Sequence, residues 1–303
     1  MPNGLQNIGN TCGINTLIQC MYSVNRIKTI LLNTISNDST LSLQFLDVFS
    51  KLQSGHSLTP NGIIQCIYSN FKDIIIPMHQ HDIGELWMLI SNKIADELGS
   101  KIQKRILDNC DPISSSIHKM NENKTSEWIK SIQGTTMSIT ECNSCKEQVY
   151  NPEIFVTFSL DIEESIIKML SNFFIIDYLP EWRCDKCKIK GGKKQSQLHK
   201  LPSVLVIQIK RFHMNNNGII KKLNDPVNIP FDLSIKTNTE DCKYILKSIG
   251  NHYGNYQFGH YTATVLENNT WYVCDDISIS ILHNIDSYLV NNTSAYLLFY
   301  ELI

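Results

Sequence analysis

The sequence predicts an α+β fold in which a helical first part is followed by a part built from strands. Apolar residues recur with helical spacing before about residue 130, whereas β-branched and aromatic runs dominate after Leu201. Between these parts, two Cys-x-x-Cys pairs flank short β-like runs. Helices first and strands later, without regular alternation, are typical of the α+β class.

The composition is that of a globular protein with a sizeable core. Of the 303 residues, 42% are hydrophobic and 18% are charged, and 27 basic against 29 acidic side chains leave a formal net charge of -2. That balance gives no support for a general nucleic-acid binder, so no nucleic acid is expected as a partner. The sequence leaves the oligomeric state open, and a monomer is the expected one.

The start of the chain lacks a basic region followed by an apolar one, and no stretch approaches eighteen consecutive apolar residues. We therefore expect neither secretion nor a membrane partner, and an intracellular location in the cytoplasm, the nucleus or both. In such a reducing setting, the ten cysteines are expected as buried, metal-bound or catalytic thiols before disulfides.

Two amphipathic helices are predicted in the first part. Ile14, Leu17, Ile18 and Met21 follow the spacing i, i+3, i+4, i+7, and the apolar residues of segment 83–94 repeat it. Each set forms one apolar stripe, which requires a core to pack against.

The middle of the chain, from about 135 to 200, is predicted to be a small β-rich lobe. Residues 154–160 form a β-like run, residues 166–174 an apolar helical stretch, and residues 188–194 a basic loop. Strands then follow at 204–209, 261–266, 271–273 and 295–300. Without a repeat or a flexible linker, the three regions are expected to be lobes of one unit.

The first chemically informative residue is Cys12, which follows a polar, glycine-containing turn and precedes the first predicted helix. A thiol at a helix N-terminus meets free amides and the positive end of the helix dipole, which are expected to lower its pKa and favour the nucleophilic thiolate. A lone cysteine is otherwise most often an inert buried residue, so the catalytic interpretation requires a base elsewhere.

A candidate base lies far downstream, in segment 259–276. This segment predicts two strands joined by a turn near Asn268 and Asn269, which brings His260 and Asp275 to the same end of one hairpin. A carboxylate beside an imidazole fixes its tautomer, and the imidazole can then take a thiol proton. Alone, the pair could be a strand-end histidine and a turn aspartate, but together with Cys12 it favours a catalytic site.

These segments resemble the ubiquitin-specific proteases, a papain-like family of deubiquitinating cysteine proteases. The Cys box of that family has the form GLxNxGNTCxxNxxxQ, and the sequence here has Gly4-Leu5-Gln6-Asn7-Ile8-Gly9-Asn10-Thr11-Cys12, then Asn15 and Gln19. The His box appears as His252-Tyr253-Gly254, Gly259-His260-Tyr261 and Trp271 to Asp276. Further matches are the Gln-Asp box at 80–86, the LP-to-KRF strand at 201–212 and the closing segment 295–300.

The resemblance implies one catalytic domain over 1–303, with a mainly helical thumb at 1–134, a zinc-bearing fingers lobe at 135–200 and a mainly β palm at 201–303. It implies hydrolysis of the isopeptide or peptide bond after the C-terminal glycine of ubiquitin, so ubiquitin and ubiquitinated proteins are the expected partners. Cys12 matches the nucleophile, His260 the general base and Asp275 the third triad member. Asn7 matches the oxyanion donor, and Asp276 is a further candidate to support the oxyanion through water.

The resemblance also implies a structural zinc in the fingers lobe and no catalytic cofactor. The four cysteines of the two pairs are the expected ligands, because four thiolates close a tetrahedral site without an open position. They are Cys142, Cys145, Cys184 and Cys187. Zinc-free turns or a redox pair are the alternatives.

Six further positions match residues that line the family's channel for the ubiquitin tail, and each could instead have a structural role. They are Asp82, Phe212, His252, Gly254, Gly259 and Tyr261. The negative charge of Asp82 suits an arginine-rich tail, and the two glycines are expected to leave room beside it. Gln80 and Glu85 are expected to stabilise the surrounding loop.

The chain also departs from the family pattern, most clearly at Gly13, where an aromatic residue is usual. This loss puts the packing beside the nucleophile in doubt and is expected to make the loop more mobile. One alternative function is therefore a catalytically weak or inactive ubiquitin-binding scaffold. Another is a protease for a different ubiquitin-like modifier, which would keep the same triad.

Overall fold

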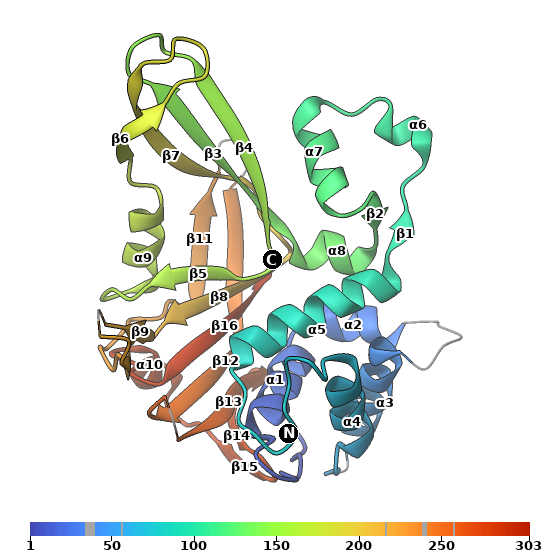
Figure 1. Ribbon diagram of the computed structural model, residues 1–303. Helices are drawn as coiled ribbons and strands as arrows, with labels where there is room; N and C mark the ends of the chain where they lie inside the picture. Colours follow the sequence, from blue (N-terminus) through green and yellow to red (C-terminus); the bar gives the residue numbers. More distant parts are fainter. Residues whose placement is uncertain (34–39, 56, 216, 238–240, 257) are drawn as a thin grey trace.

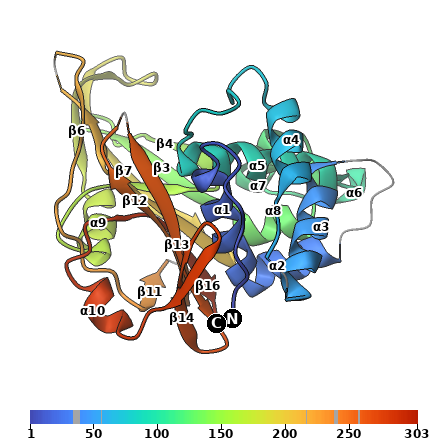
Figure 2. The ribbon, with the colours of Figure 1, turned by 90° about the horizontal axis from the view of Figure 1, so that it is seen from below.

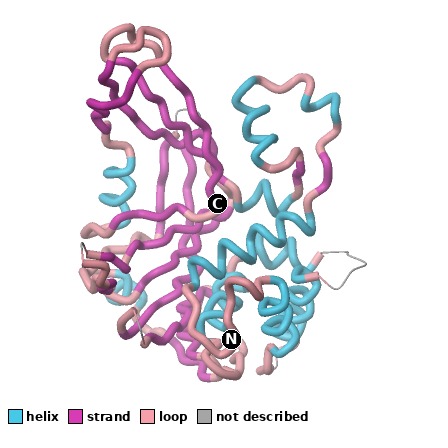
Figure 3. The backbone as a smooth tube through the Cα atoms, in the orientation of Figure 1, coloured by secondary structure: helices cyan, strands magenta, loops and turns pink. Residues whose placement is uncertain are grey.

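The computed structural model describes residues 1–33, 40–55, 57–215, 217–237, 241–256 and 258–303, and its mixture of helices and mainly antiparallel sheets confirms the α+β class. Figure 3 shows the helices gathered mainly on one side and the strands on the other. The helices are α1 (Cys12–Ser23), α2 (Asn25–Leu32), α3 (Leu41–Gln53), α4 (Asn61–Asn70), α5 (Ile83–Leu98), α6 (Lys104–Leu107), α7 (Pro112–Met120), α8 (Glu127–Ile132), α9 (Ile166–Phe173) and α10 (Ile285–Leu289). In the described segments, no helix has the length and apolar character needed to span a membrane.

An eight-stranded sheet forms the centre of the molecule (Figure 1). Its order is β15-β14-β13-β12-β16-β8-β5, with β11 paired to β12. These strands are β5 (Phe158–Asp161), β8 (Val204–Lys210), β11 (Asp232–Lys236), β12 (Asp241–Gly254), β13 (Gly259–Glu267), β14 (Thr270–Asp275), β15 (Ser278–Ile281) and β16 (Ala295–Leu302).

A four-stranded sheet extends away from the central sheet (Figure 1), in the order β4-β3-β7-β6. It consists of β3 (Gly134–Cys142), β4 (Gln148–Phe155), β6 (Asp177–Arg183) and β7 (Lys190–Lys200). Two small ribbons pair β1 (Ser100–Lys101) with β2 (Lys124–Thr125), and β9 (Phe212–Met214) with β10 (Ile220–Lys222).

Strand β16 separates two hydrophobic cores, because successive side chains of a strand point to opposite faces. Leu297 and Phe299 pack in the core shared with the first helices, whereas Leu298 and Tyr300 pack in the second core, near α9 and α10. All four side chains are fully buried. This two-sided burial explains the continuous apolar run at 295–300.

Helix α1 is buried along its whole length. Figure 2 shows it between the strands of the central sheet and the remaining N-terminal helices, and it packs against β12 and β13 on one side and α5 on the other. A helix in this position brings its first residue, Cys12, to the sheet that carries His260.

The main sequence predictions for individual elements are confirmed. Both amphipathic helices are present, as α1 and α5, and the four predicted strands after Leu201 are β8, β13, β14 and β16. The run at 154–160 is divided, since β4 ends at Phe155 and β5 begins at Phe158 in another sheet.

The basic loop predicted at 188–194 is wrong, because β7 begins at Lys190. The strand tolerates its charges because opposite charges on neighbouring strands pair with them. Lys190 lies 2.5 Å from Glu181 on β6, and Lys193 lies 3.2 Å from Glu141 on β3.

Candidate active site

Cys12 is the first residue of α1 and is almost completely buried, with 2% of its surface exposed. The backbone amide of Tyr261, on β13, makes a hydrogen bond to its sulfur. The predicted location at a helix N-terminus is therefore confirmed. The thiol contacts the residue that directly follows His260 on β13.

The predicted lowering of the Cys12 pKa is wrong. Burial is the largest influence and raises the pKa of the thiol, and the negative charge of Asp276 raises it further. The backbone amides of Tyr261 and Gly13 oppose this effect but do not outweigh it. Burial therefore favours the neutral form of this thiol over the thiolate.

His260 and Asp275 are in direct contact, with 2.6 Å between Nε2 and Oδ1. The antiparallel pairing of β13 with β14, in which Ala263 faces Cys274, brings the beginning of one strand to the end of the other. The predicted hairpin geometry is confirmed. Both side chains are partly exposed, at 42% and 53%, so the pair lies at the surface beside a buried thiol.

The side chain of Asn7 is held at both ends. Its Oδ1 accepts from the amides of Gly9 and Thr11, at 3.2 and 3.1 Å, and from the Thr11 hydroxyl at 3.1 Å. Its Nδ2 donates to Oδ2 of Asp276 at 2.9 Å. An amide nitrogen carries two hydrogens, so this bond uses only one of them.

Asp276 anchors the turn that carries Asn7. Its carboxylate accepts from Asn7 and, at 2.8 Å, from Nδ2 of Asn15 on α1, while its carbonyl accepts from the amide of Leu5 at 2.9 Å. Its backbone has a positive φ of 50°. The water-mediated role predicted for Asp276 is untested, whereas this direct contact with Asn7 was not foreseen.

A short segment before α5 contacts both halves of the site. The side-chain amide of Gln80 donates to the carbonyl of Gly259, and its Oε1 accepts from the Gly259 amide at 3.1 Å. Two residues earlier, the carbonyl of Met78 accepts from Nδ2 of Asn10 at 2.6 Å. Gln80 therefore does more than stabilise its own loop, because it fixes the residue before His260.

The space beside Gly13 is already filled. A Cβ added there would lie 3.1 Å from the carbonyl oxygen of His81, 3.3 Å from the side chain of Ile83 and 3.5 Å from the ring of Tyr261. An aromatic residue would not fit this arrangement, and Gly13 itself is buried within α1. The doubt about local packing is thus removed, because neighbouring residues close the gap.

Asp82 caps α5, since its Oδ1 accepts from the amides of Gly84 and Glu85 at 2.8 and 2.9 Å. Its Oδ2 accepts from the Tyr296 hydroxyl at 2.5 Å. Asp82 therefore has a structural role of its own, and its contact with a substrate tail stays a prediction.

Three of the predicted tail-channel residues form one aromatic cluster. The His252 ring lies 5.2 Å from that of Phe212 and 4.7 Å from that of Tyr261, between ring centroids. His252 is 4% exposed, and burial, with the positive charge of Lys222, lowers its pKa to about 4. Its Nδ1 has no hydrogen-bond partner among the described residues, so His252 is a neutral, packed side chain.

Gly254 and Gly259 face each other across β12 and β13. Gly254 has a φ of +92°, which L-residues rarely adopt, and a Cβ on Gly259 would lie 2.1 Å from Nε2 of His252. Packing inside the chain therefore requires both glycines. Their predicted role beside a substrate tail is untested.

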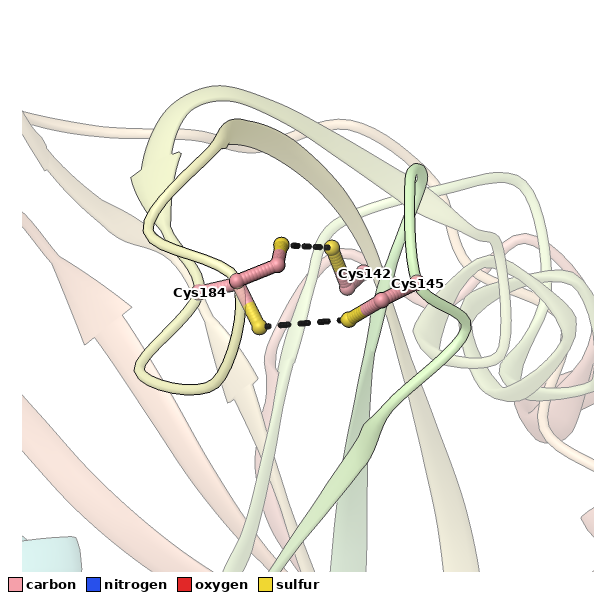
Figure 4. A group of neighbouring side chains, drawn as sticks. Cys142, Cys145 and Cys184 are labelled. Carbon is pink, nitrogen blue, oxygen red and sulfur yellow. Dashed lines mark hydrogen bonds between the residues drawn. The ribbon is translucent and has the colours of Figure 1, made fainter.

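The four cysteines predicted as zinc ligands form one cluster, shown in Figure 4. The sulfurs of Cys142 and Cys187 are 3.6 Å apart, and those of Cys145 and Cys184 are 3.7 Å apart. Sulfurs bound to one tetrahedral zinc at about 2.3 Å lie about 3.8 Å from one another. The spacing therefore fits a zinc ion.

Both Cys-x-x-Cys turns have the same backbone, which supports a shared ligand. Lys146 and Lys188, each directly after the second cysteine of its pair, have φ of 60° and 61°. The amides of these lysines donate to the carbonyls of Cys142 and Cys184, at 3.1 and 2.9 Å. All four sulfurs lie within 4.8 Å of one another.

Comparison with known sequences gives one consistent family. The family model described as ubiquitin carboxyl-terminal hydrolase matches residues 3–300. The chain is 28% identical to ubiquitin carboxyl-terminal hydrolase 4 of Arabidopsis thaliana, over 98% of the chain and 92% of that protein. It is 23% identical to probable ubiquitin carboxyl-terminal hydrolase 8 of Schizosaccharomyces pombe, over 98% of the chain but 64% of that longer protein.

Solved structures show the same fold. A SAGA DUB module of Ubp8, Sgf11, Sus1 and Sgf73 bound to monoubiquitin contains a chain that matches with a TM-score of 0.80 and 24% identity, over 100% of this chain and 71% of that one. A yeast SAGA DUB module matches with the same TM-score and identity, over 100% and 70% of the two chains.

Proposed function

The chain belongs to the ubiquitin carboxyl-terminal hydrolase family and is a ubiquitin-specific cysteine protease, and on that premise we propose that it hydrolyses the isopeptide or peptide bond after the C-terminal glycine of ubiquitin. The observation that supports this reaction best is the contact of His260 with Asp275 beside the buried thiol of Cys12. Ubiquitin and ubiquitinated proteins are the proposed partners, and the cell interior the proposed location.

The fold is the papain-like fold of the ubiquitin-specific proteases, with helices, a four-stranded sheet and a central sheet in the places of thumb, fingers and palm. We propose that residues 1–303 form one catalytic domain, with the thumb at 1–134, the fingers at 135–200 and the palm at 201–303. The two cores on either side of β16 support this unity, because one strand contributes to both.

Nucleophilic attack begins with loss of the Cys12 proton to His260. Since Nε2 of His260 contacts Asp275, Nδ1 is the nitrogen left to accept that proton. The Asp275 carboxylate stabilises the imidazolium that forms. Because burial raises the pKa of the Cys12 thiol, a nearby base is needed to take its proton.

The sulfur then attacks the carbonyl carbon of the terminal glycine, and negative charge develops on the carbonyl oxygen. The second hydrogen of the Asn7 amide is the proposed donor to this oxyanion, because Asp276 takes the first. The bonds to Gly9 and Thr11 keep the amide in position before substrate arrives.

Collapse of the tetrahedral intermediate breaks the bond to the leaving amine, which takes the proton from His260. A thioester between Cys12 and ubiquitin remains, and His260 takes a proton from water as the water oxygen attacks the thioester carbon. The C–S bond then breaks, the ubiquitin carboxylate leaves, and the Cys12 sulfur takes the proton back from His260. The triad is thereby restored without any other cofactor in the proposed cycle.

Zinc is the proposed structural metal, held by Cys142, Cys145, Cys184 and Cys187. When bound, it would supply a fourfold cross-link between the two Cys-x-x-Cys turns, with no position open for chemistry. The cysteines themselves join β3 to the turn between β6 and β7.

A ubiquitin probe with an electrophilic C-terminus tests the function. We expect the probe to form a covalent adduct with the wild-type protein and with Cys66→Ala, a matched change of a partly exposed thiol on α4, but not with Cys12→Ala. The Cys12→Ala protein should still bind ubiquitin. An adduct on Cys12→Ala would refute the proposed nucleophile, and preferential labelling by a probe made from another ubiquitin-like modifier would refute the proposed substrate.

A further inference from the structure

A cavity of about 350 Å³ lies between α7, α8 and the adjoining ends of β3 and β7. That volume is at the lower end of the range for small-molecule pockets. In the described part of the chain, its lining shares no residue with the candidate active site or with the cysteine cluster.

Basic side chains from four elements converge on this cavity. They are His118 of α7, Lys124 of β2, Lys130 of α8, and His199 and Lys200 of β7. Among the described residues that line it, none is Asp or Glu. A cavity with this lining favours an anionic ligand.

Two of the lysines are partly neutralised by partners outside the cavity. Lys124 lies 3.0 Å from Asp96 and 3.1 Å from Glu122, and Lys130 lies 2.9 Å from Glu127. Lys200, in contrast, has no ion pair with any residue that the structure describes. Lys200 is therefore the principal uncompensated positive charge of the cavity.

Thr135, at the start of β3, forms part of the floor of the cavity. It is 4% exposed, and its hydroxyl has no hydrogen-bond partner among the described residues. It lines the cavity and pairs with Lys200 across β3 and β7. Because the hydroxyl oxygen is itself sealed from solvent, Thr135 forms a wall of the cavity and does not donate to a ligand there.

The fourth side of the cavity is one face of α7. Ser114, Ile117, His118 and Asn121 line it with the spacing of a single helical face, and no residue of α7 is buried. Ile129 of α8 adds a second apolar side chain. The face that a helix normally packs against a core therefore covers the cavity instead.

We infer that this cavity binds a small phosphorylated molecule. Its phosphate oxygens are bound by Lys200 and the two histidines, and its organic part packs against Ile117 and Ile129. Phosphate oxygens are strong acceptors for several donors at once, which suits donors that converge from separate elements. Binding joins α7 to β7, two elements that belong to different lobes.

Calorimetric titration with adenosine diphosphate, inorganic pyrophosphate and adenosine tests the inference. We expect both phosphates to bind, adenosine not to bind, and adenosine diphosphate to bind more tightly because of its organic part. Lys200→Gln should weaken binding about tenfold or more, whereas Lys243→Gln, a matched change on the exposed side of β12, should not.

Thr135→Val separates a ligand contact from a structural role. Removing an unpartnered buried hydroxyl should raise the melting temperature of the free protein and leave the binding of both phosphates unchanged, because the hydroxyl does not face the cavity. Absence of binding at millimolar concentrations, or equal effects of the changes at Lys200 and Lys243, would overturn the inference. Tighter binding of pyrophosphate would overturn the role assigned to the two isoleucines.

Discussion

Gln80 connects two parts of the candidate active site that are 179 residues apart in the sequence. Its side chain bonds both backbone groups of Gly259, directly before His260. A displacement of about 1 Å at a reacting group can reduce turnover by roughly a hundredfold. We therefore regard Gln80 as a positioning residue for the histidine.

Gln80→Met removes both bonds and keeps the length of the side chain. We expect kcat for a fluorogenic ubiquitin substrate to fall about tenfold or more with little change in KM, because the lost interaction orients His260 and does not bind substrate. Gln65→Met, on the exposed side of α4, is the matched control. An unchanged kcat would show that His260 needs no support from Gln80, and a change confined to KM would indicate a substrate contact instead.

His252 makes the stability of the protein depend on pH. Its pKa falls from the ordinary 6.5 to about 4 in the folded protein because of burial, so the unfolded chain binds its proton at a higher pH than the folded one. Stability is therefore unaffected above about 6.5 and decreases as the pH falls toward 4, by up to about 3 kcal/mol.

Urea unfolding at pH 7.5 and pH 4.5 measures this contribution. We expect His252→Phe to lose less stability between these two values than the wild type, because a phenyl ring cannot be protonated and Nδ1 loses no hydrogen bond. An equal loss in both proteins would exclude His252 as the source. The comparison between pH values cancels any constant packing difference caused by the larger ring.

The residues of the site could be predicted from the sequence to different degrees. Cys12, His260 and Asp275 could be predicted, because Cys12 lies in a recognisable motif and a single hairpin brings His260 and Asp275 together. The contacts of Gln80 with Gly259 and of Asp276 with Asn7 join distant segments without a local pattern, so only the folded chain reveals them. The Cys12 pKa was predicted in the wrong direction because burial, which sequence cannot quantify, outweighs the helix amides.

At the scale of elements, apolar periodicity predicted α1, α5, β8 and β16 correctly, since each packs a defined face against a core. Strand β7 was missed because most of it packs against no large core, and its lysines suggested a loop. Its stability comes from backbone pairing with β3 and β6 and from cross-strand ion pairs. We therefore expect the cysteine turns at the ends of these strands to contribute to their stability.

Metal analysis and chelation test that importance. We expect about one zinc per purified chain and, after removal by a strong chelator, loss of protection from hydrogen exchange in β3, β6 and β7 before any loss in β12 to β14. Cys142→Ser should reproduce this pattern, and Cys110→Ser, a partly exposed thiol outside the cluster, should not. Zinc-free protein with unchanged protection in these three strands would contradict the proposed site.

At the scale of the whole molecule, the contact of Asp82 with Tyr296 joins the helical lobe to the central sheet. Asp82 begins α5, and its partner Tyr296 lies on β16. The amides of Gly84 and Glu85 and the hydroxyl of Tyr296 occupy three of about four acceptor positions of the Asp82 carboxylate. The described bonds leave one acceptor position unused, and we propose that the carboxylate uses it to bind an arginine-rich tail.

The charge of Asp82 can be removed without breaking the helix cap, because Asn caps as well as Asp. We expect Asp82→Asn to raise KM for ubiquitin about tenfold with a smaller effect on kcat, since it removes a binding interaction and leaves the thiol chemistry intact. Ubiquitin whose tail arginines are replaced by glutamate should be a poor substrate for the wild type. The same tail should be less impaired with Asp82→Asn, because the repulsion between like charges is then absent.

The four combinations of enzyme and tail form a double-mutant cycle, which isolates the interaction between Asp82 and the tail from the structural effects of either change. A coupling clearly different from zero would assign the recognition of the basic tail to Asp82. Additive effects would leave Asp82 as a cap of α5 alone, and the preference for ubiquitin would then have to come from the globular contact surface, while the mechanism at Cys12 would be unaffected.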